Sequence, residues 1–141
     1  MKAHLKQTAE QLGLPFGERD KTFNSRLAQE LGLWAESKDK GDEFHKAAFM
    51  AYFADGKNIA KIPVLLDMVE SIELSRDEAE RVLNTRAFKS KVDSDWALSK
   101  EKGIRAVPSF LIDSHRVVGA QPYKTLELLL VESGVKKKVI P

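Results

Sequence analysis

The amino-acid sequence predicts a mostly helical α/β fold, and two features of its pattern lead to this class. From residue 2 to residue 102, apolar residues recur at helical spacing in six successive segments, which Gly, Pro or capping residues separate. Only then do two short β-type runs follow, PSFLI at 108–112 and RVVGA at 116–120, before one last helix. We therefore expect a helical region followed by a β-hairpin and a helix.

The first two helices are expected at residues 1–12 and 23–34. A Gly-Leu-Pro step at 13–15 ends the first helix, and the charged loop GLPFGERDK separates it from the second. Apolar residues recur every three or four positions in both segments, so each helix has one face that can be buried. These residues are Leu5, Ala9 and Leu12 in the first helix, and Phe23, Leu27 and Leu31 in the second.

The third helix is rich in aromatic residues. Asp42 is expected to be its N-cap, and Asp55-Gly56 ends the pattern. Its broad apolar face predicts a helix that is packed on more than one side. The residues of that face are Phe44, Ala48, Phe49, Tyr52 and Phe53.

Local signals define the starts of the fourth and fifth helices. Pro63 is compatible with the first turn of the fourth helix, whose apolar face includes Leu65 and Val69. The fifth helix follows SRDE at 75–78, which has the form of a capping box with Ser75 at the N-cap and Glu78 three residues later.

The sixth helix is expected from Phe88 to Lys102, with Val92 and Trp96 facing inward. The two β-type runs then form a hairpin with a three-residue connection, DSH at 113–115. The last helix runs from Tyr123 to Glu132. Because an isolated two-stranded hairpin is marginally stable, it must pack on helices or pair with another strand.

Composition limits the classes of function. The 141 residues have a formal net charge of +2, which gives little support for nucleic-acid binding, and they contain no cysteine. This excludes disulfides, cysteine metal sites and a cysteine nucleophile within the chain. The first residues lack the apolar core of a signal peptide, and no run approaches the ~20 apolar residues that span a bilayer. We expect a soluble, cytoplasmic protein that does not bind a membrane.

Three segments together resemble one known family. EKGIRAVPSFLIDSHRVVGAQPYKTLELLL, at 101–130, resembles the C-terminal part of the DsbA family of thioredoxin-like proteins. The segment from 45 to 83 resembles the helical insertion of the FrnE-like and 2-hydroxychromene-2-carboxylate isomerase-like branch of that family. LGLPFGERDKTFNSRLAQELG, at 12–32, resembles the segment that leads into this insertion. The order of these segments is more specific than any one of them.

The resemblance implies a domain organisation. Residues 1–102 would be the DsbA-type helical insertion, and residues 103–141 would be the C-terminal part of a thioredoxin-like fold, a β-hairpin with the last helix. The family's first unit, a strand, a helix that begins with Cys-x-x-Cys and a second strand, has no counterpart in this sequence.

The resemblance also has chemical implications. The family is one of thiol-disulfide oxidoreductases and isomerases, and thiol exchange needs a low-pKa thiolate. Since neither this thiolate nor the serine of the isomerases has a counterpart here, we expect the chain alone to be redox-inactive. We assign no catalytic residue, no cofactor and no metal ligand. His4, His45 and His115 match no metal-binding spacing.

Val107, Pro108 and Ser109 are the candidate residues for binding a substrate or partner. The resemblance implies a cis Val107–Pro108 bond and a preceding backbone that binds an extended peptide by strand addition. The simpler interpretation is a retained turn that starts the strand. Ser109 has no Asp–His pair placed by the sequence to activate it, so we do not expect it to be a nucleophile.

Partners are predicted from the same hairpin, because its outer edge would expose unpaired backbone groups. We expect a homodimer, formed through the hairpin edge or through helical faces. The chain is then either a DsbA-like protein without its redox centre or a non-enzymatic binding and self-association module. A third interpretation, a pocket for a small apolar ligand, competes with simple core packing of the aromatic residues Trp34, Phe44, Phe49, Tyr52, Phe53 and Trp96.

Overall fold

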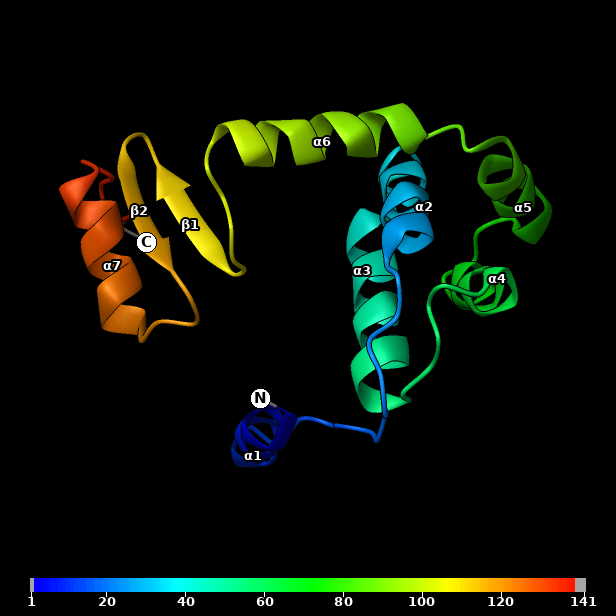
Figure 1. The fold of residues 1–141 in the computed structure, drawn as a ribbon, viewed down its shortest axis with the longest axis horizontal. Coiled ribbons are helices and arrows are strands. Elements are labelled where there is room, and N and C mark those ends of the chain that lie inside the picture. The colour runs from blue at the N-terminus through cyan, green and yellow to red at the C-terminus, as the bar shows by residue number, and fades with distance from the viewer. Residues whose placement is uncertain (1, 139–141) are drawn as a thin grey trace. The chain divides into compact units, whose positions relative to one another are not determined.

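A computed structural model describes residues 2–138, and its internal contacts divide the chain into two compact units, one up to Ser94 and one from Asp95 onward. Figure 1 shows the elements in chain order. They are α1 (Lys2–Gln11), α2 (Arg26–Glu36), α3 (Gly41–Phe49), the π-helical turn η1 (Met50–Ala54), α4 (Ile62–Ser71), α5 (Arg76–Thr85), α6 (Lys89–Glu101), β1 (Ser109–Ile112), β2 (His115–Val118) and α7 (Tyr123–Glu132).

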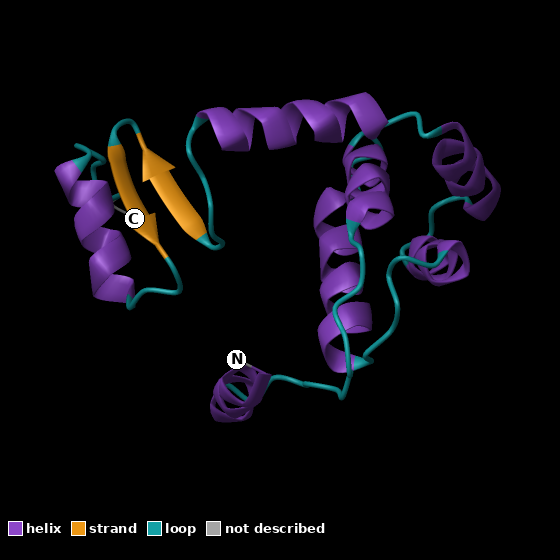
Figure 2. Ribbon diagram, viewed as in Figure 1, coloured by secondary structure: helices purple, strands orange, loops and turns teal. Residues whose placement is uncertain are grey.

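The predicted class, mostly α with one two-stranded sheet, is confirmed (Figure 2). The border between the two units lies within α6, whereas the border proposed from the sequence, after residue 102, lies just beyond the end of that helix. None of the helices within residues 2–138 is long and apolar enough to cross a membrane.

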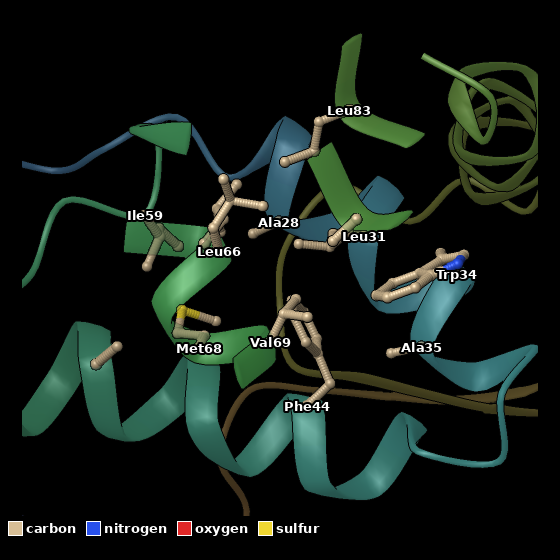
Figure 3. Close-up of a cluster of buried hydrophobic side chains, with 13 residues drawn as sticks. Ala28, Leu31, Trp34, Ala35, Phe44, Ile59, Leu66, Met68, Val69 and Leu83 are labelled. Carbon is tan, nitrogen blue, oxygen red and sulfur yellow. The ribbon is translucent and has the colours of Figure 1, made fainter. Parts of the chain in front are cut away.

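The core of the first unit is formed by α2, α3, α4 and α5, whose apolar faces meet (Figure 3). Helical spacing explains the set, because residues three or four apart lie on one face of a helix. Leu31, Leu65 and Val69 are fully buried, and Trp34 and Phe44 are nearly so. The aromatic residues of α2 and of the start of α3 are therefore core residues, as packing of these faces predicts.

Of the two N-caps predicted from the sequence, the structure confirms one. Ser75 is the N-cap of α5 as predicted, and its hydroxyl accepts a hydrogen bond from the Glu78 amide at 3.2 Å. The predicted N-cap Asp42 is wrong, because the N-cap is Lys40 and the helix starts at Gly41. Asp42 and Glu43 instead lie in the first turn, where carboxylates are favourable near the positive end of the helix dipole.

The third helix does not end as a regular α-helix. Its last turn, Met50–Ala54, is π-helical, a rare geometry that sequence periodicity does not reveal. The loop before α2 lies against this turn, and the Gly17 amide donates a hydrogen bond to the Phe53 carbonyl at 2.7 Å. A Cβ at Gly17 would lie 2.1 Å from the Ala54 carbonyl oxygen, so only glycine fits there.

Helix α6 has one buried position in the first unit. Val92 is 2% exposed, as predicted, but Trp96, which was predicted to face inward, is 54% exposed. Both residues lie on one helical face. The first compact unit ends at Ser94, so its core does not extend to Trp96.

A buried ion-pair network joins α2, α5 and α6. The Glu30 carboxylate is 1% exposed and accepts two hydrogen bonds from Arg86, at 2.8 and 2.6 Å, and one from Arg26, at 2.9 Å. Arg26 also donates to Asp93, at 2.5 Å. The hydrogen bonds from Arg86 lower the pKa of Glu30, burial opposes this, and Arg26 adds to the lowering.

The second unit contains the hairpin and α7. Strands β1 and β2 are antiparallel, with Ile112 opposite His115 and Ser109 opposite Val118. The predicted three-residue connection is wrong, because His115 already belongs to β2 and only Asp113 and Ser114 link the strands. Asp113 adopts a left-handed φ of 51°, which Asp tolerates better than most residues, and this permits the tighter turn.

Candidate functional site

The loop that contains the candidate residues is held at its start by Arg116. Helix α6 ends in a Schellman motif, in which Gly103 has a φ of 66° and the Ile104 amide donates to the Ser99 carbonyl at 2.9 Å. From β2, the Arg116 guanidinium donates to the carbonyls of Gly103, at 3.0 Å, and of Lys102. A cation at this position also complements the negative end of the helix dipole. The loop therefore leaves α6 in a defined direction.

A few residues after the contact with Arg116, the loop reaches Val107, Pro108 and Ser109. The Val107–Pro108 peptide bond is cis, and Val107 is 88% exposed. The Ser109 hydroxyl donates to the Ala106 carbonyl at 2.6 Å, so its proton is held by a group that cannot act as a general base. This geometry agrees with a structural role for Ser109 and gives no support for a nucleophile.

The hairpin register determines which backbone groups face outward. In an antiparallel pair, residues alternate between those that bond to the partner strand and those whose N–H and C=O point away from it. With a two-residue connection, Ile112 and His115 form the first bonded pair, and the next is Phe110 with Val117. The Gly119 amide donates to the Pro108 carbonyl at 2.8 Å, which extends the same alternation beyond the strand.

Val107, Ser109 and Leu111 consequently present their backbone N–H and C=O groups to the outer side of β1. Within residues 2–138, the sheet has β1 and β2 alone, so no third strand covers this side. Over the same residues, no backbone hydrogen bond of Val107 is found. We call the outward-facing groups of Val107, Ser109 and Leu111 the outer edge.

Apolar residues of the hairpin itself are partly exposed. Phe110 is 37% exposed and Val118 47% exposed, while Leu129 of α7 is buried. Figure 2 shows α7 beside the hairpin. An edge with free backbone donors and acceptors and with exposed apolar side chains is a template for an additional strand.

The aromatic residues that could have formed a ligand pocket are only partly brought together. Phe49 and Phe53 line two apolar hollows of about 330 and 340 Å³ next to η1, and Tyr52 and the largely buried Phe44 line the second of them. Trp34 is buried in the core. The Arg19 guanidinium lies over the Tyr52 ring, 4.1 Å from its centroid, and 5.0 Å from that of Phe53. Many of these aromatic residues thus pack against other residues of the first unit.

No group of three His, Asp or Glu residues suitable for a metal ion occurs in the part of the chain that the structure describes. Sequence reasoning named Val107, Pro108 and Ser109 as candidates, and the structure adds Leu111 on the same edge and Arg116 at the start of the loop. Strand alternation from Val107 would have indicated Leu111. Arg116 could not have been found in this way, because its partners lie on another element, thirteen and fourteen residues away.

Three comparisons relate the chain to known proteins. A family model described as the DSBA-like thioredoxin domain matches residues 1–131. The uncharacterized protein YwbO of Bacillus subtilis (strain 168) is 28% identical over 112 residues, which cover 79% of this chain and 56% of YwbO. The crystal structure of a probable DsbA oxidoreductase from Streptomyces coelicolor has a TM-score of 0.85 and 22% identity to this chain.

The structural match covers 99% of this chain and 62% of the Streptomyces protein. The chain therefore spans 56% and 62% of the lengths of these two proteins. At 22% identity the structural likeness shows a shared fold.

Proposed function

This chain belongs to the DSBA-like thioredoxin domain family, and from this premise we propose that it recognises an extended peptide segment through the outer edge of β1 without exchanging disulfides itself. Val107, Pro108 and Ser109 form the recognition loop, and Leu111 continues the edge. The observation on which the proposal depends is the exposed Val107 backbone without a hydrogen bond, directly before a strand with an uncovered side.

Strand addition suits these groups physically. An extended peptide that pairs with Val107, Ser109 and Leu111 would satisfy backbone donors and acceptors that the hairpin leaves unused. Such main-chain pairing supplies affinity with little dependence on the peptide sequence. Exposed Val107 and Phe110 would then add apolar contacts with the alternate side chains of the peptide.

The proposal separates recognition from chemistry. Thiol-disulfide exchange requires an attacking thiolate, and these 141 residues contain no cysteine. The family activity, thiol-disulfide oxidation, is therefore not proposed for this chain alone. Its place in the FrnE-like branch and a cytoplasmic location stay predictions, the latter testable by fractionation of the native host.

A second copy of the chain is the partner we propose for the same edge when no peptide is bound. Two β1 strands that pair across their outer edges would form a four-stranded sheet, which relieves the marginal stability of an isolated hairpin. The alternative homodimer, through helical faces, would leave the outer edge free. Light scattering at several protein concentrations distinguishes a dimer from a monomer.

Peptide recognition is tested with a labelled, reduced and alkylated insulin B chain as the extended probe, followed by fluorescence anisotropy. Replacing Val107 with proline removes one outward-facing N–H and should weaken binding about tenfold, which corresponds to one hydrogen bond between backbone groups. Val107→Ala, which keeps the N–H, should weaken binding less.

The control places proline at Arg105, an exposed position two residues earlier in the same loop. Arg105→Pro should retain most of the wild-type affinity, and circular dichroism should show that all variants stay folded. Equal losses for Val107→Pro and Arg105→Pro, or no binding of the probe by the wild type, would contradict recognition by the outer edge.

A further inference from the structure

Helix α7 has more apolar surface than the hairpin can cover. Its sequence YKTLELLLVE has apolar residues on every side, a pattern typical of a helix that is buried all round. Only Leu129 is buried, while Leu128, Leu130 and Val131 are 50%, 43% and 62% exposed. The side of α7 away from the hairpin is therefore an unusual surface for a helix in water.

The chain after α7 turns back along the helix. Gly134 has a φ of 74°, and the Val135 amide donates to the Leu130 carbonyl at 3.0 Å, which is the long hydrogen bond of a Schellman motif. The turn brings residues 135–138 beside the helix and encloses a groove of about 360 Å³. The groove is lined by Tyr123, Leu126, Glu127, Leu130 and Val131 of α7 and by Val135, Lys136, Lys137 and Lys138.

Charge is distributed unevenly along this groove. Its helical side is apolar apart from Glu127, whereas its other side has three consecutive lysines, Lys136–Lys138. No ion pair within residues 2–138 involves any of these lysines, and all three are exposed. The groove thus combines an apolar surface with three lysines that outnumber its one carboxylate, Glu127.

We propose that the groove between α7 and residues 135–138 binds a medium-chain aliphatic carboxylate, with its alkyl chain on α7 and its carboxylate at Lys136–Lys138. The groove volume lies at the lower end of the range for small-molecule sites. Its apolar stripe, from Tyr123 to Val131, is about 12 Å long at 1.5 Å per residue. These dimensions fit a single alkyl chain and are too small for a protein interface.

The proposal is tested by isothermal titration of the whole chain with monomeric decanoate. Octanoate should bind about fifteenfold more weakly, because each methylene removed from water contributes about fourfold. Decyltrimethylammonium, which has the same chain and the opposite charge, should not bind measurably. Raising the salt concentration should weaken the binding of decanoate, since exposed charges are screened.

Two matched pairs of variants locate the site. Replacing Lys136, Lys137 and Lys138 with glutamine should weaken decanoate about tenfold, whereas glutamine at Lys21, Lys46 and Lys61, three exposed lysines elsewhere, should have little effect at the same net charge. Leu130→Ser should weaken decanoate about fivefold or more. Leu128→Ser should not, because Leu128 is exposed on the same helix but does not line the groove.

Vesicles that contain anionic phospholipid distinguish a free carboxylate from a membrane surface. Binding to such vesicles without binding of monomeric decanoate would overturn the proposal. It would also be overturned by equal affinity for decyltrimethylammonium, by equal losses for the two lysine triples or by equal losses for Leu128→Ser and Leu130→Ser. The peptide proposal does not depend on these outcomes, because the outer edge of β1 contains none of these residues.

Discussion

At the residue scale, Glu30 illustrates how a charge is accommodated in the core. An ionised carboxylate that is 1% exposed would be strongly unfavourable without partners. Arg86 supplies two parallel hydrogen bonds and Arg26 a third, so the charge is compensated by groups from the end of α5 and the start of α2. The carboxylate also joins these helices to the first turn of α6 through Arg26, which donates to the Lys89 carbonyl.

Replacing Glu30 with glutamine should therefore destabilise the first unit. The variant leaves Arg86 and Arg26 without the carboxylate charge, and we expect the free energy of unfolding to fall by about 2 kcal/mol. Urea denaturation followed by circular dichroism measures this loss. The control is Glu18→Gln, because the Glu18 side chain pairs with Lys6 but is 86% exposed, and there the change should be below about 0.5 kcal/mol.

The same residue makes stability depend on pH. The pKa of Glu30 is lower in the folded chain than the ordinary value of about 4.3 in the unfolded chain. Its contribution is thus fully present above the unfolded pKa and is lost as the pH falls through the folded pKa. Between about pH 5 and pH 3, the wild type should lose more unfolding free energy than Glu30→Gln. If the unfolding free energies of the two proteins change in parallel with pH, Glu30 is not the source of this pH dependence.

At the element scale, the two-residue turn between β1 and β2 determines which backbone groups of the hairpin face outward. Because the turn contains only Asp113 and Ser114, the residues that bond within the hairpin are Phe110 and Ile112, and Leu111 faces outward. A three-residue connection, as predicted from the sequence, would leave that assignment open. Which backbone groups are available to a partner therefore follows from the turn.

Leu111→Pro provides the sharpest test of the outer edge. Proline is tolerated on an edge strand where its missing N–H would face solvent, so the hairpin should stay folded. Self-association by light scattering should be lost, and affinity for the insulin B chain should fall. Phe110→Pro, one residue away, removes a ladder hydrogen bond and should instead disrupt the hairpin. If Leu111→Pro forms the wild-type dimer, the dimer does not use this edge.

At the scale of the whole molecule, the two units differ in how much core they contain. The first unit buries a continuous cluster from four helices, whereas Leu129 is the one apolar residue of the second unit's described part that is fully buried. A unit as small as residues 95–141 obtains little stability from its own core. Exposed apolar surface and a free strand edge on the same unit favour association.

The absence of cysteine gives a prediction for the whole chain. In an insulin-reduction assay with dithiothreitol, the chain should give the same rate as buffer, because it supplies no thiolate. Its affinity for the reduced and alkylated insulin B chain should be unchanged between reducing and oxidising buffers. A disulfide oxidoreductase with an intact Cys-x-x-Cys serves as the positive control. Reduction of insulin above the buffer rate would refute the proposal that the chain binds peptides without exchanging disulfides.

The sequence by itself determined the fold class, most helix positions, the Ser75 cap and the cis Val107–Pro108 bond before the first strand. These follow from apolar periodicity, from local hydrogen bonding and from a resemblance that extends over most of the chain. Local signals failed at two places. Periodicity predicted that Trp96 faces inward, but it is 54% exposed, because the core of the first unit ends before it. Periodicity also did not reveal the π-helical turn Met50–Ala54, against which the loop around Gly17 lies.

Only the tertiary structure decided which groups lie together. Arg86, at the end of α5, meets Glu30 and Arg26 of α2, and Arg116 reaches back to the end of α6. Lys136–Lys138 lie along α7 because Gly134 reverses the chain. The physical reason is that periodicity fixes the face on which a residue lies, whereas its partner on another element depends on how the chain turns and packs.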